Sequence, residues 1–477
     1  MDELSPTEDP SIALVVDLDG TLSRTDTLHE ALLGLATREP LALLKLPLWL
    51  SEGRAELKAH LVDRGVVDPE TLPMSPGVIA MVTAAREEGR PTALVSAADH
   101  RQVTAVAEAT GLFDEAYGSA EGLNLKGTEK AAFLTNRYGP AGFDYLGDSA
   151  ADAPVWKAAR RAITVGASRH VRQVAEGANP AAHHVEPPEG RAWAMLRAMR
   201  PHQWSKNLLL FLPVLAAQDL GSFPTVLIAF VAFCLTASAV YVINDLLDLP
   251  ADRAHPRKRN RPFAAGDLSA VTGIAMAAVF LLVALILTLI VGTPRFIALI
   301  GIYFGLTFLY SLWLKRELLI DVVTLAGLYT IRIGAGAAAA PVTLSPWLMG
   351  FSMFLFLCLA AVKRQAELTD QIETGRTSSG RAYQTEDLPV LRGIAISAGN
   401  TAVLVLALYI SSDNFQGLYS DPGYLWLICP VMLYWCMRMV MKAHRGQMTD
   451  DPIVFAITDK LSLAAIAASA AILIAAI

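Results

Sequence analysis

The second half of the chain is a succession of long uncharged runs that begins near Lys206 and continues to the end. Each run has roughly the length of the α-helix of about 20 residues that crosses the hydrocarbon layer of a bilayer. The first and the sixth run are short for a crossing. We therefore expect residues 200–477 to form an all-α polytopic membrane bundle of about nine transmembrane helices. The runs are residues 207–219, 223–243, 269–292, 295–314, 319–340, 346–362, 388–410, 423–441 and 454–477.

Residues 1–200 differ from the rest because charged and turn-forming residues are mixed throughout. The 477 residues suffice for two domains, and 53% hydrophobic residues with a mean hydropathy of +0.41 indicate a protein that is partly membrane-embedded. We expect a soluble domain over residues 1–175 and a loop-like linker, rich in Pro and Gly, over residues 176–199. The net charge of −6 argues against nucleic acid as a partner, and the four cysteines show no metal-binding spacing.

The soluble domain contains short, continuously apolar runs of the kind that form buried parallel strands. They cover residues 11–16, 92–95, 143–146 and 162–165, with helical patterns between them. This alternation predicts an α/β fold with a doubly wound parallel sheet. Asp17, Asp19 and Asp148 follow directly on such runs, at the strand ends where open α/β sheets keep their sites.

These residues resemble the motifs of the haloacid-dehalogenase (HAD) phosphatase superfamily over residues 11–175. The resemblance rests on DLDGTL at positions 17–22, a Ser, a Lys and GDSAAD at positions 147–152, in that order. It implies that Asp17 is the nucleophile that becomes an aspartyl phosphate and that Asp19 is the acid/base. A pseudoenzyme kept only as a scaffold is the alternative, although no catalytic position is missing. The resemblance further implies phosphoryl binding by Ser96 and Lys130, with Lys126 less favoured than Lys130, and Mg²⁺ binding by Asp17, Asp148 and Asp152.

Residues 23–90 form a long insert between the first two motifs and carry helical patterns, so we expect a small helical cap over the site. Caps in the HAD superfamily exclude water and select the substrate, which implies small phosphorylated compounds here. Residues 40–50, PLALLKLPLWL, are unusually apolar for a cap. They either pack on the sheet or touch the membrane surface.

Basic residues indicate the orientation in the membrane. Lys and Arg concentrate in residues 253–261, 315–316, 363–392 and 438–445, whereas the alternate loops hold almost none. By the positive-inside rule the basic loops are cytoplasmic. We predict a multi-pass protein of the cell membrane with the soluble domain and both sites in the cytoplasm. An odd number of spans leaves the C-terminus outside.

The sequence NDLLDLPAD at positions 244–252 places carboxylates beside the membrane, and the basic sequence HPRKRNRP follows at positions 255–262. In a helix, residues 245, 248 and 252 are three and four apart and share one face. Three carboxylates on one face repel one another unless a cation neutralises them. Oxygen ligands that leave most coordination positions open suit a Mg²⁺ ion that holds a diphosphate. Lys258, Arg259 and Arg261 would hold the remaining phosphate oxygens. The alternative is a solvated juxtamembrane helix whose acids pair with the Arg and Lys that follow.

Over residues 196–477 the chain resembles the UbiA superfamily of intramembrane prenyltransferases. The first acidic motif fits closely, whereas the second, KRELLID at positions 315–321, has Glu317 where Asp is usual. The resemblance therefore assigns the metal role in the second motif to Asp321. It implies that Asp245 and Asp248 are catalytic and that Mg²⁺ is held by Asp245, Asp248, Asp252 and Asp321.

Within this superfamily the details resemble the polyprenyl-phosphate phosphoribosyltransferases. The motifs are RPHQWSKN at 200–207, HPRKRNRP at 255–262, YSLWLK at 310–315 and KRQAEL at 363–368. The resemblance implies that the diphosphate belongs to phosphoribosyl pyrophosphate and that a polyprenyl phosphate is the nucleophile. Arg332 lies within an apolar run and should face the site or an acid. The expected substrate-binding residues are Lys206, Asn244, Lys258, Arg259, Lys315, Arg332, Lys363 and Arg364.

The fusion of a phosphatase with a transferase suggests sequential steps, in which the HAD domain removes the 5-phosphate from polyprenyl-phosphoryl-5-phosphoribose. One alternative is a UbiA-type prenyltransferase that moves a polyprenyl group from its diphosphate to an aromatic acceptor, with a separate HAD substrate. Another is a lipid-binding or transport protein with a regulatory HAD domain. The polyprenyl length and the oligomeric state do not follow from these motifs.

Overall fold

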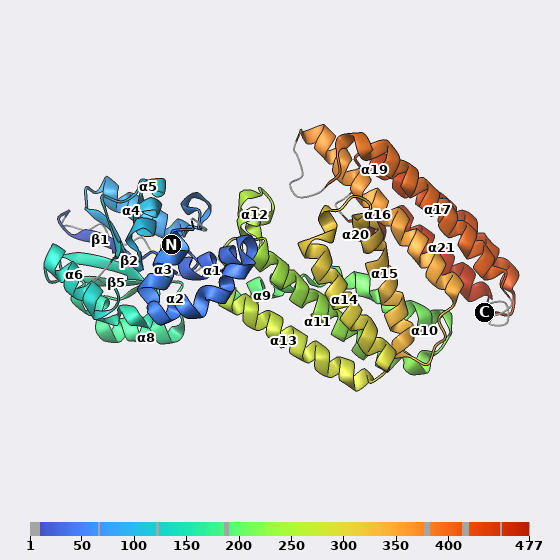
Figure 1. Cartoon of the computed structure of the whole chain (residues 1–477), viewed down its shortest axis with the longest axis horizontal. Helices are drawn as coiled ribbons and strands as arrows, with labels where there is room; N and C mark the ends of the chain where they lie inside the picture. The colour runs from blue at the N-terminus through green and yellow to red at the C-terminus, as the bar shows by residue number, and fades with distance from the viewer. Residues whose placement is uncertain are drawn as a thin grey trace. The chain divides into compact units, whose positions relative to one another are not determined.

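The computed structural model describes residues 10–64, 67–120, 124–185, 190–375, 382–412, 419–448 and 451–476. The chain divides into two compact units. The first comprises Met1–Met199 and Tyr241–Ala277, and the second comprises Arg200–Val240 and Ala278–Ile477. A β-sheet flanked by helices belongs to the N-terminal part, and long helices make up the remainder (Figure 1).

A parallel sheet of six strands forms the centre of the N-terminal part. The strand order is β3-β2-β1-β4-β5-β6, and every neighbouring pair is parallel. The predicted α/β class with a parallel sheet is thereby confirmed, and β3 and β6 extend the four predicted strands. The strands are β1 Ala13–Val16, β2 Thr92–Asp99, β3 Glu115–Ser119, β4 Phe143–Gly147, β5 Arg161–Val165 and β6 His183–Val185.

Both faces of this sheet are covered by helices, which explains why its strands are continuously apolar. Side chains alternate between the faces, so Leu14 and Val16 pack into one core and Ala13 and Val15 into another. Helices α4 (Pro76–Glu87) and α5 (His100–Thr110) contribute to the first core. Helices α6 (Thr128–Tyr138), α7 (Ala153–Ala158) and α8 (Arg169–Ala178) contribute to the second.

The cap consists of four short helical segments with a core of their own, formed around Leu35, Trp49 and Leu61. It is shorter than the expected range of residues 23–90, because α4 packs on the sheet instead. Residues 40–50 also depart from one of the two interpretations, since Ala42 and Trp49 pack inside the cap core and not on the sheet. The segments are α1 Thr27–Arg38, η1 Pro40–Lys45, α2 Leu46–Glu52 and α3 Arg54–Val62.

The expected linker is only partly irregular. Residues 183–185 form β6, which pairs with β5, and α9 (Arg191–Met199) follows, while residues 186–189 lie outside the described part of the chain. The first unit also includes the segment after the acidic motif, with α12 (Leu249–Ala254) and η6 (Lys258–Asn260). Buried ion pairs hold this segment to the N-terminal residues: Arg253 pairs with Glu30 at 2.6 Å, and Arg24 with Asp267 at 2.7 Å.

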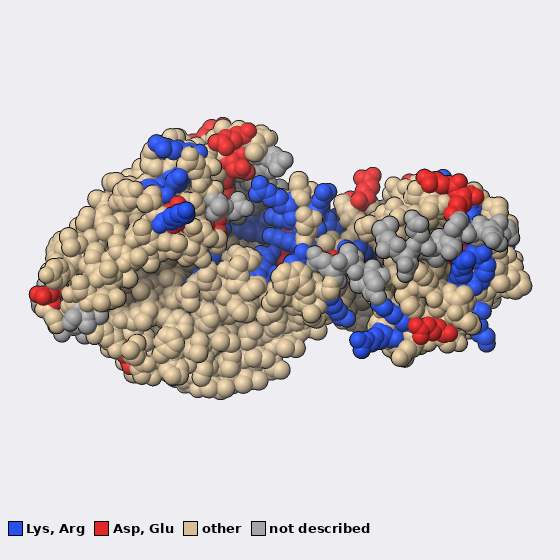
Figure 2. All heavy atoms as spheres, turned by 180° about the vertical axis from the view of Figure 1, so that it is seen from behind, with Lys and Arg blue, Asp and Glu red and all other residues tan. Residues whose placement is uncertain are grey.

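The C-terminal part is helical and has the length and apolarity of a multi-pass membrane protein. Seven described helices are long and apolar enough to cross a bilayer, or eight if α20 and α21, bent by 78°, form one broken span. The face of this part drawn in Figure 2 is mostly uncharged, with Lys, Arg, Asp and Glu confined to a few places. The helices are α11 Phe223–Leu247, α13 Ala270–Val291, α14 Pro294–Leu312, α15 Ile320–Ala339, α16 Pro346–Thr374, α17 Leu388–Ile410, α19 Ile428–His444, α20 Pro452–Thr458 and α21 Lys460–Ala476.

The predicted number of nine spans is not confirmed. The first predicted span, residues 207–219, falls on η4 (Pro201–Phe211) and α10 (Leu212–Ala216), which are not among the candidate spans. The sixth was predicted to end at residue 362, but α16 continues to Thr374. Lys363 and Arg364 therefore lie on a helix and not in a loop. Residues 376–381 of the expected basic loop, residues 363–392, lie outside the described residues.

Candidate active sites

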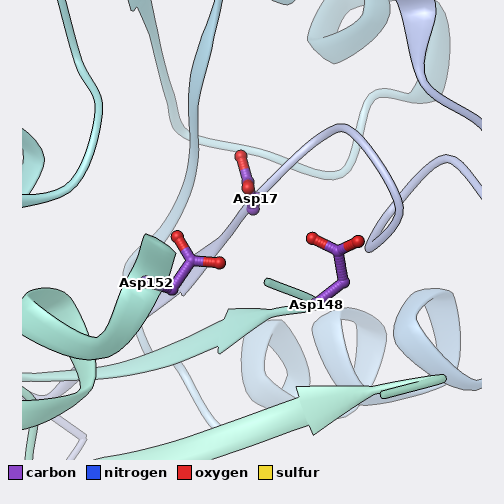
Figure 3. A group of neighbouring side chains, drawn as sticks. All are labelled: Asp17, Asp148 and Asp152. Atoms are coloured by element: carbon purple, nitrogen blue, oxygen red, sulfur yellow. The ribbon is translucent and has the colours of Figure 1, made fainter. Parts of the chain in front are cut away.

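Three carboxylates converge at the centre of the sheet edge in the N-terminal part (Figure 3). Asp17 follows β1, whereas Asp148 and Asp152 follow β4. Because β1 and β4 are neighbouring parallel strands, their carboxyl ends meet at one edge. One oxygen from each residue lies within 4.8 Å of the others, the only such group of metal-ligating side chains among the described residues.

This cluster carries more negative charge than its surroundings neutralise. Burial, together with the charges of Asp17 and Asp152, raises the pKa of Asp148 to about 8. Burial and the charge of Asp17 raise the pKa of Asp152 to about 6. The Lys130 ammonium lies 3.1 Å from Asp17 Oδ1 and supplies one compensating charge. Three converging oxygens with excess negative charge fit a divalent cation such as Mg²⁺.

Asp19 has the environment of a group that exchanges protons near neutral pH. Its Oδ1 accepts a hydrogen bond from the backbone N–H of Thr27 at 2.7 Å, at the start of the cap. Burial, with the charge of Asp26, raises the pKa of Asp19 to about 6. An acid with such a pKa can both give and take a proton at physiological pH.

The backbone between these acids depends on Gly20, which has a φ of +73°. A Cβ at this position would lie 2.1 Å from Asp148 Oδ2. Only glycine therefore allows the Asp17 loop to pass so close to the Asp148 carboxylate.

The two other residues predicted for phosphoryl binding occupy different environments. Ser96 is buried within β2, and its Oγ accepts the backbone N–H of Ala98 at 3.1 Å. Lys130 is buried and contacts Asp17, whereas Lys126 is exposed on the wall of the neighbouring cavity. The structure thus brings Lys130, and not Lys126, to the predicted nucleophile.

A cavity of about 740 Å³ lies between the cap and the sheet domain, with Asp19 in its lining. Sequence reasoning missed Lys58 of α3, which lines this cavity and donates a hydrogen bond to the carbonyl of Ala97 at 2.7 Å. Burial lowers the pKa of Lys58, although the charges of Asp19 and Asp26 oppose this. No motif signals Lys58, because the folding of the cap alone brings it to the site.

The first acidic motif of the helical part lies at the end of α11. Asp245 and Asp252 are both buried and accept hydrogen bonds from the same guanidinium nitrogen of Arg261, at 3.1 and 2.6 Å. This agrees with the alternative in which the acids pair with the basic residues that follow. It also shows that the two carboxylates can share one cation, the arrangement that metal binding requires.

The remaining predicted residues of this motif surround the pair. Asp248 occupies the N-terminal cap position of α12 without a side-chain capping bond, and its backbone N–H donates to the carbonyl of Asn244 at 2.8 Å. Lys258 and Arg259 lie exposed on η6. Two cations that remain accessible beside two buried acids suit an anionic ligand such as a phosphate.

The second motif contains an ion pair buried in the helical bundle. Asp321 of α15 lies 2.6 Å from Arg364 Nε of α16, and it accepts a hydrogen bond from Tyr310 at 2.6 Å. Arg364 also pairs with Glu367. Asp321 Oδ1 thus accepts a hydrogen bond, whereas Asp321 Oδ2 meets Arg364 as an ion pair without a hydrogen bond. Lys315 and Glu317 are half-buried in the segment before α15.

The expectation for Arg332 was that it faces the site or an acid, and the hydrogen-bond partners that the structure describes for it are neutral groups. Its Nε donates to Asn207 Oδ1 at 2.8 Å, and its other nitrogens donate to the hydroxyl of Tyr303 and the carbonyl of Leu328. Its guanidinium also lies 4.8 Å from the Tyr303 ring centre and 5.4 Å from that of Tyr329. Neutral acceptors and aromatic faces suffice to stabilise a buried guanidinium.

Lys206 forms an ion pair with Asp451, which sequence reasoning missed. The charges of both residues act on Lys363 of α16. Three segments far apart in sequence thus bring two lysines and one carboxylate together. Asp451 directly precedes the final apolar segment, so an acid at the edge of a membrane run was the available signal.

Residues 208–466 match the model of the UbiA prenyltransferase family. The chain belongs to this family. An uncharacterized protein of Sinorhizobium fredii, y4nM, is 36% identical to this UbiA protein over 95% of the chain and 89% of its own length. Nodulation protein NoeC of Azorhizobium caulinodans is 39% identical over 56% of the chain and 88% of its own length. Decaprenyl-phosphate phosphoribosyltransferase of Corynebacterium glutamicum is 31% identical over 58% of the chain and 84% of its own length.

Solved structures resemble the two parts of this UbiA protein separately. The structure of a UbiA homolog from Archaeoglobus fulgidus, bound to DMAPP and Mg²⁺, aligns with 58% of the chain over 98% of its own length. The sequence identity is 15% and the TM-score is 0.45. The structure of a phospho-aspartyl intermediate analogue of phosphoserine phosphatase aligns with 38% of the chain over 95% of its own length. The sequence identity is 17% and the TM-score is 0.28.

Proposed function

We propose that the UbiA domain transfers phosphoribose from phosphoribosyl pyrophosphate to a polyprenyl phosphate and that the HAD domain removes the 5-phosphate of the product. An oxygen of the lipid phosphate attacks C1 of the ribose, the bond from C1 to the pyrophosphate oxygen breaks, and pyrophosphate leaves. Water then hydrolyses the 5-phosphate at the second site. Both steps stay on one lipid.

The observation that carries this proposal is the similarity to decaprenyl-phosphate phosphoribosyltransferases, one of which the chain matches over 84% of its length. The cations described above support it, because a phosphoribosyl donor and a lipid phosphate present more phosphate groups than a prenyl diphosphate alone. Lys258 and Arg259 suit the donor, and Lys206 and Lys363 suit the remaining phosphates. Asn244, Lys315 and Arg332 complete the proposed substrate-binding set.

Magnesium would be held by Asp245, Asp248, Asp252 and Asp321, where it would supply positive charge for the leaving pyrophosphate. Arg261 already bridges two of these acids, so the donor and its metal would replace Arg261. The freed guanidinium can then bind a phosphate oxygen.

In the HAD site Asp17 attacks the phosphorus of the 5-phosphate and forms an aspartyl phosphate. The bond from phosphorus to the ribose oxygen breaks, and Asp19 gives its proton to that oxygen. Asp19 then takes a proton from the water that hydrolyses the aspartyl phosphate. Lys130 and Ser96 hold the phosphoryl oxygens. Magnesium, held by Asp17, Asp148 and Asp152, would neutralise the charge that accumulates on the phosphoryl group.

We place the HAD domain, both sites and the acidic motif on the cytoplasmic side. Arg191 donates to Thr272 at 2.8 Å and Arg197 to Asp267 at 2.9 Å, so α9 lies on the same side as the segment after α11. We infer from this that the chain crosses the bilayer once between Arg200 and α11. The 11 residues of η4 and the 5 of α10 span about 30 Å, the thickness of the hydrocarbon layer. This supports nine crossings and an external C-terminus.

The test uses the purified full-length protein in detergent with Mg²⁺, a polyprenyl phosphate and phosphoribosyl pyrophosphate labelled in the ribose. We expect label in the lipid phase, its loss with Asp245→Asn or with EDTA, and its retention with Asp219→Asn, which lies before the opposite end of α11. Asp17→Asn should accumulate the 5-phosphorylated lipid, whereas wild type makes the dephosphorylated one. Absence of label from lipid in wild type would overturn the transferase proposal. An unchanged product with Asp17→Asn would overturn the second step.

The second candidate is transfer of a polyprenyl group to an aromatic acceptor, which the name of the matching family model favours. Polyprenyl diphosphate and an aromatic acid in the same assay distinguish it. Formation of a prenylated aromatic product, without label transfer from the ribose donor, would replace the first proposal.

A further inference from the structure

The exposed apolar side chains of the HAD-like domain are concentrated in one short segment. Among the described residues between positions 10 and 185, the large hydrophobic side chains that are exposed are Leu41, Leu44, Leu48 and Leu50, at 79%, 80%, 60% and 54%. All four lie on η1 and α2 of the cap, within the apolar helical stretch Leu41–Ser51. A soluble domain rarely gathers its exposed apolar surface in this way without a binding partner.

The segment has two distinct faces. Ala42 and Trp49 are buried in the cap core, and Trp49 stacks on His60 with ring centres 5.1 Å apart. Leu41, Leu44 and Leu48 are three and four positions apart, so they share the opposite face. The leucines are therefore not a loosely packed part of the core, because the same segment anchors itself through other residues.

We propose that this leucine face inserts into the bilayer in which the helical part of the same chain is embedded. The described residues of the same chain include seven candidate spans, so the cap is covalently tethered to a bilayer. The exposed side chains of Arg38 and Lys45 flank the leucines and suit anionic lipid headgroups. A lipid surface needs no shape complementarity, so it fits a row of leucines that are all more than half exposed.

The leucine face leads to the phosphatase cavity. Leu50 is exposed and also lines the cavity, whose wall continues with Leu28, Leu57 and Leu61 toward Asp19. The cavity is thus apolar on the cap side and charged at the acids. This arrangement suits a phosphate carried on a lipid whose apolar chain enters from the bilayer, an extension that rests on the proposed function.

The docking itself is tested without any substrate. The full-length protein, with bimane attached at Leu44→Cys, is placed in nanodiscs that contain doxyl-labelled phospholipids. We expect strong quenching at residue 44 and none at Lys157→Cys, an exposed position on α7. Wild-type protein treated with the same label measures the background from the native cysteines. Absence of quenching at residue 44, or equal quenching at both positions, would overturn the proposal and leave a protein partner or a second copy as the occupant.

The consequence for turnover is tested with a triple variant, Leu41→Ser/Leu44→Ser/Leu48→Ser. We expect hydrolysis of the 5-phosphorylated lipid in nanodiscs to fall by at least about tenfold, because three leucines leave the bilayer. Hydrolysis of p-nitrophenyl phosphate, which needs no membrane, should stay unchanged and shows that the domain is folded. An unchanged rate on the lipid would overturn lipid entry through this face. Quenching at residue 44 without any hydrolysis of the lipid by wild type would instead refute the proposed substrate and leave the docking standing.

Discussion

Two glycines of α15 offer a matched test of how closely the helical bundle is packed. A Cβ on Gly336 would lie 1.9 Å from the carbonyl oxygen of Leu210 in η4. A Cβ on Gly334, two residues earlier, would meet only Leu299 Cδ1 at 3.8 Å, an ordinary van der Waals contact. We predict that Gly336→Ala destabilises the protein and that Gly334→Ala does not.

The expected magnitude follows from the overlap. A carbon–oxygen contact needs about 3.3 Å, so the Leu210 backbone must retreat by more than about 1 Å. Overpacking of this kind costs about 1–3 kcal/mol, and the gain of Ala over Gly in a helix offsets at most about 1 kcal/mol of it. Gly336→Ala should therefore lower the apparent Tm by about 2–6 °C, whereas Gly334→Ala should leave it unchanged or slightly higher.

The shift should also reach the site. Asn207 lies three residues before Leu210, and its Oδ1 accepts the 2.8 Å hydrogen bond from Arg332 Nε. Both variants are compared with wild type by thermal unfolding in the same detergent at one scan rate, together with label transfer to lipid. Equal Tm values for the two variants would refute the close approach of η4 to α15. Full transferase activity of a destabilised Gly336→Ala would refute the link from Leu210 to Arg332.

Three further predictions concern the charged groups. In EDTA, the apparent Tm should rise as pH falls from 8.5 to 6.5. The reason is that folded Asp148, with its pKa of about 8, takes up a proton while the carboxyl of the unfolded chain stays ionised. Asp148→Asn should weaken this pH dependence, and a Tm that falls with falling pH would contradict the prediction. Asp321→Asn should lower the free energy of unfolding by about 3–5 kcal/mol, because Arg364 stays buried with weakened pairing. The double variant Asp321→Leu/Arg364→Met should recover the Tm but not the transferase activity. Recovery of both would show that the ion pair is purely structural. Lys58→Met should raise KM for the 5-phosphorylated lipid about tenfold, as expected for the loss of a charged hydrogen bond. Transfer of label to lipid should stay unchanged, and Lys157→Met serves as the control. An unaffected KM would place Lys58 outside the substrate site.

Local sequence predicted the elements of this protein well where one physical pattern dominates. The continuous apolar runs before Asp17 and Asp148 predicted β1 and β4, and the helical patterns between the runs predicted that the sheet is parallel. The prediction was weaker where composition alone was the guide. Residues 207–219 are apolar enough for one continuous membrane helix, yet they form the end of a 3₁₀ segment and a short helix, with Pro213 at the start of the latter.

The partners of the charged residues were beyond local patterns. Sequence analysis singled out Arg332 for its apolar surroundings, but its neutral partner Asn207 is 125 positions away. It singled out Lys206, whose partner Asp451 is 245 positions away. Periodicity constrains which face of an element is apolar, but it contains no information on which distant element covers that face.

The sequence by itself determined the chemistry that is available: an apolar strand followed by DLDGTL, long uncharged runs, and acids next to a basic cluster at the membrane edge. Each of these follows from the cost of burying a charge or a polar backbone, which acts on neighbouring residues. Only the tertiary structure decided that Lys58 reaches the cavity, that Arg261 bridges Asp245 and Asp252, and that the leucines of the cap face outward. These arrangements depend on packing between segments, where many sequences of equal hydrophobicity allow different partners.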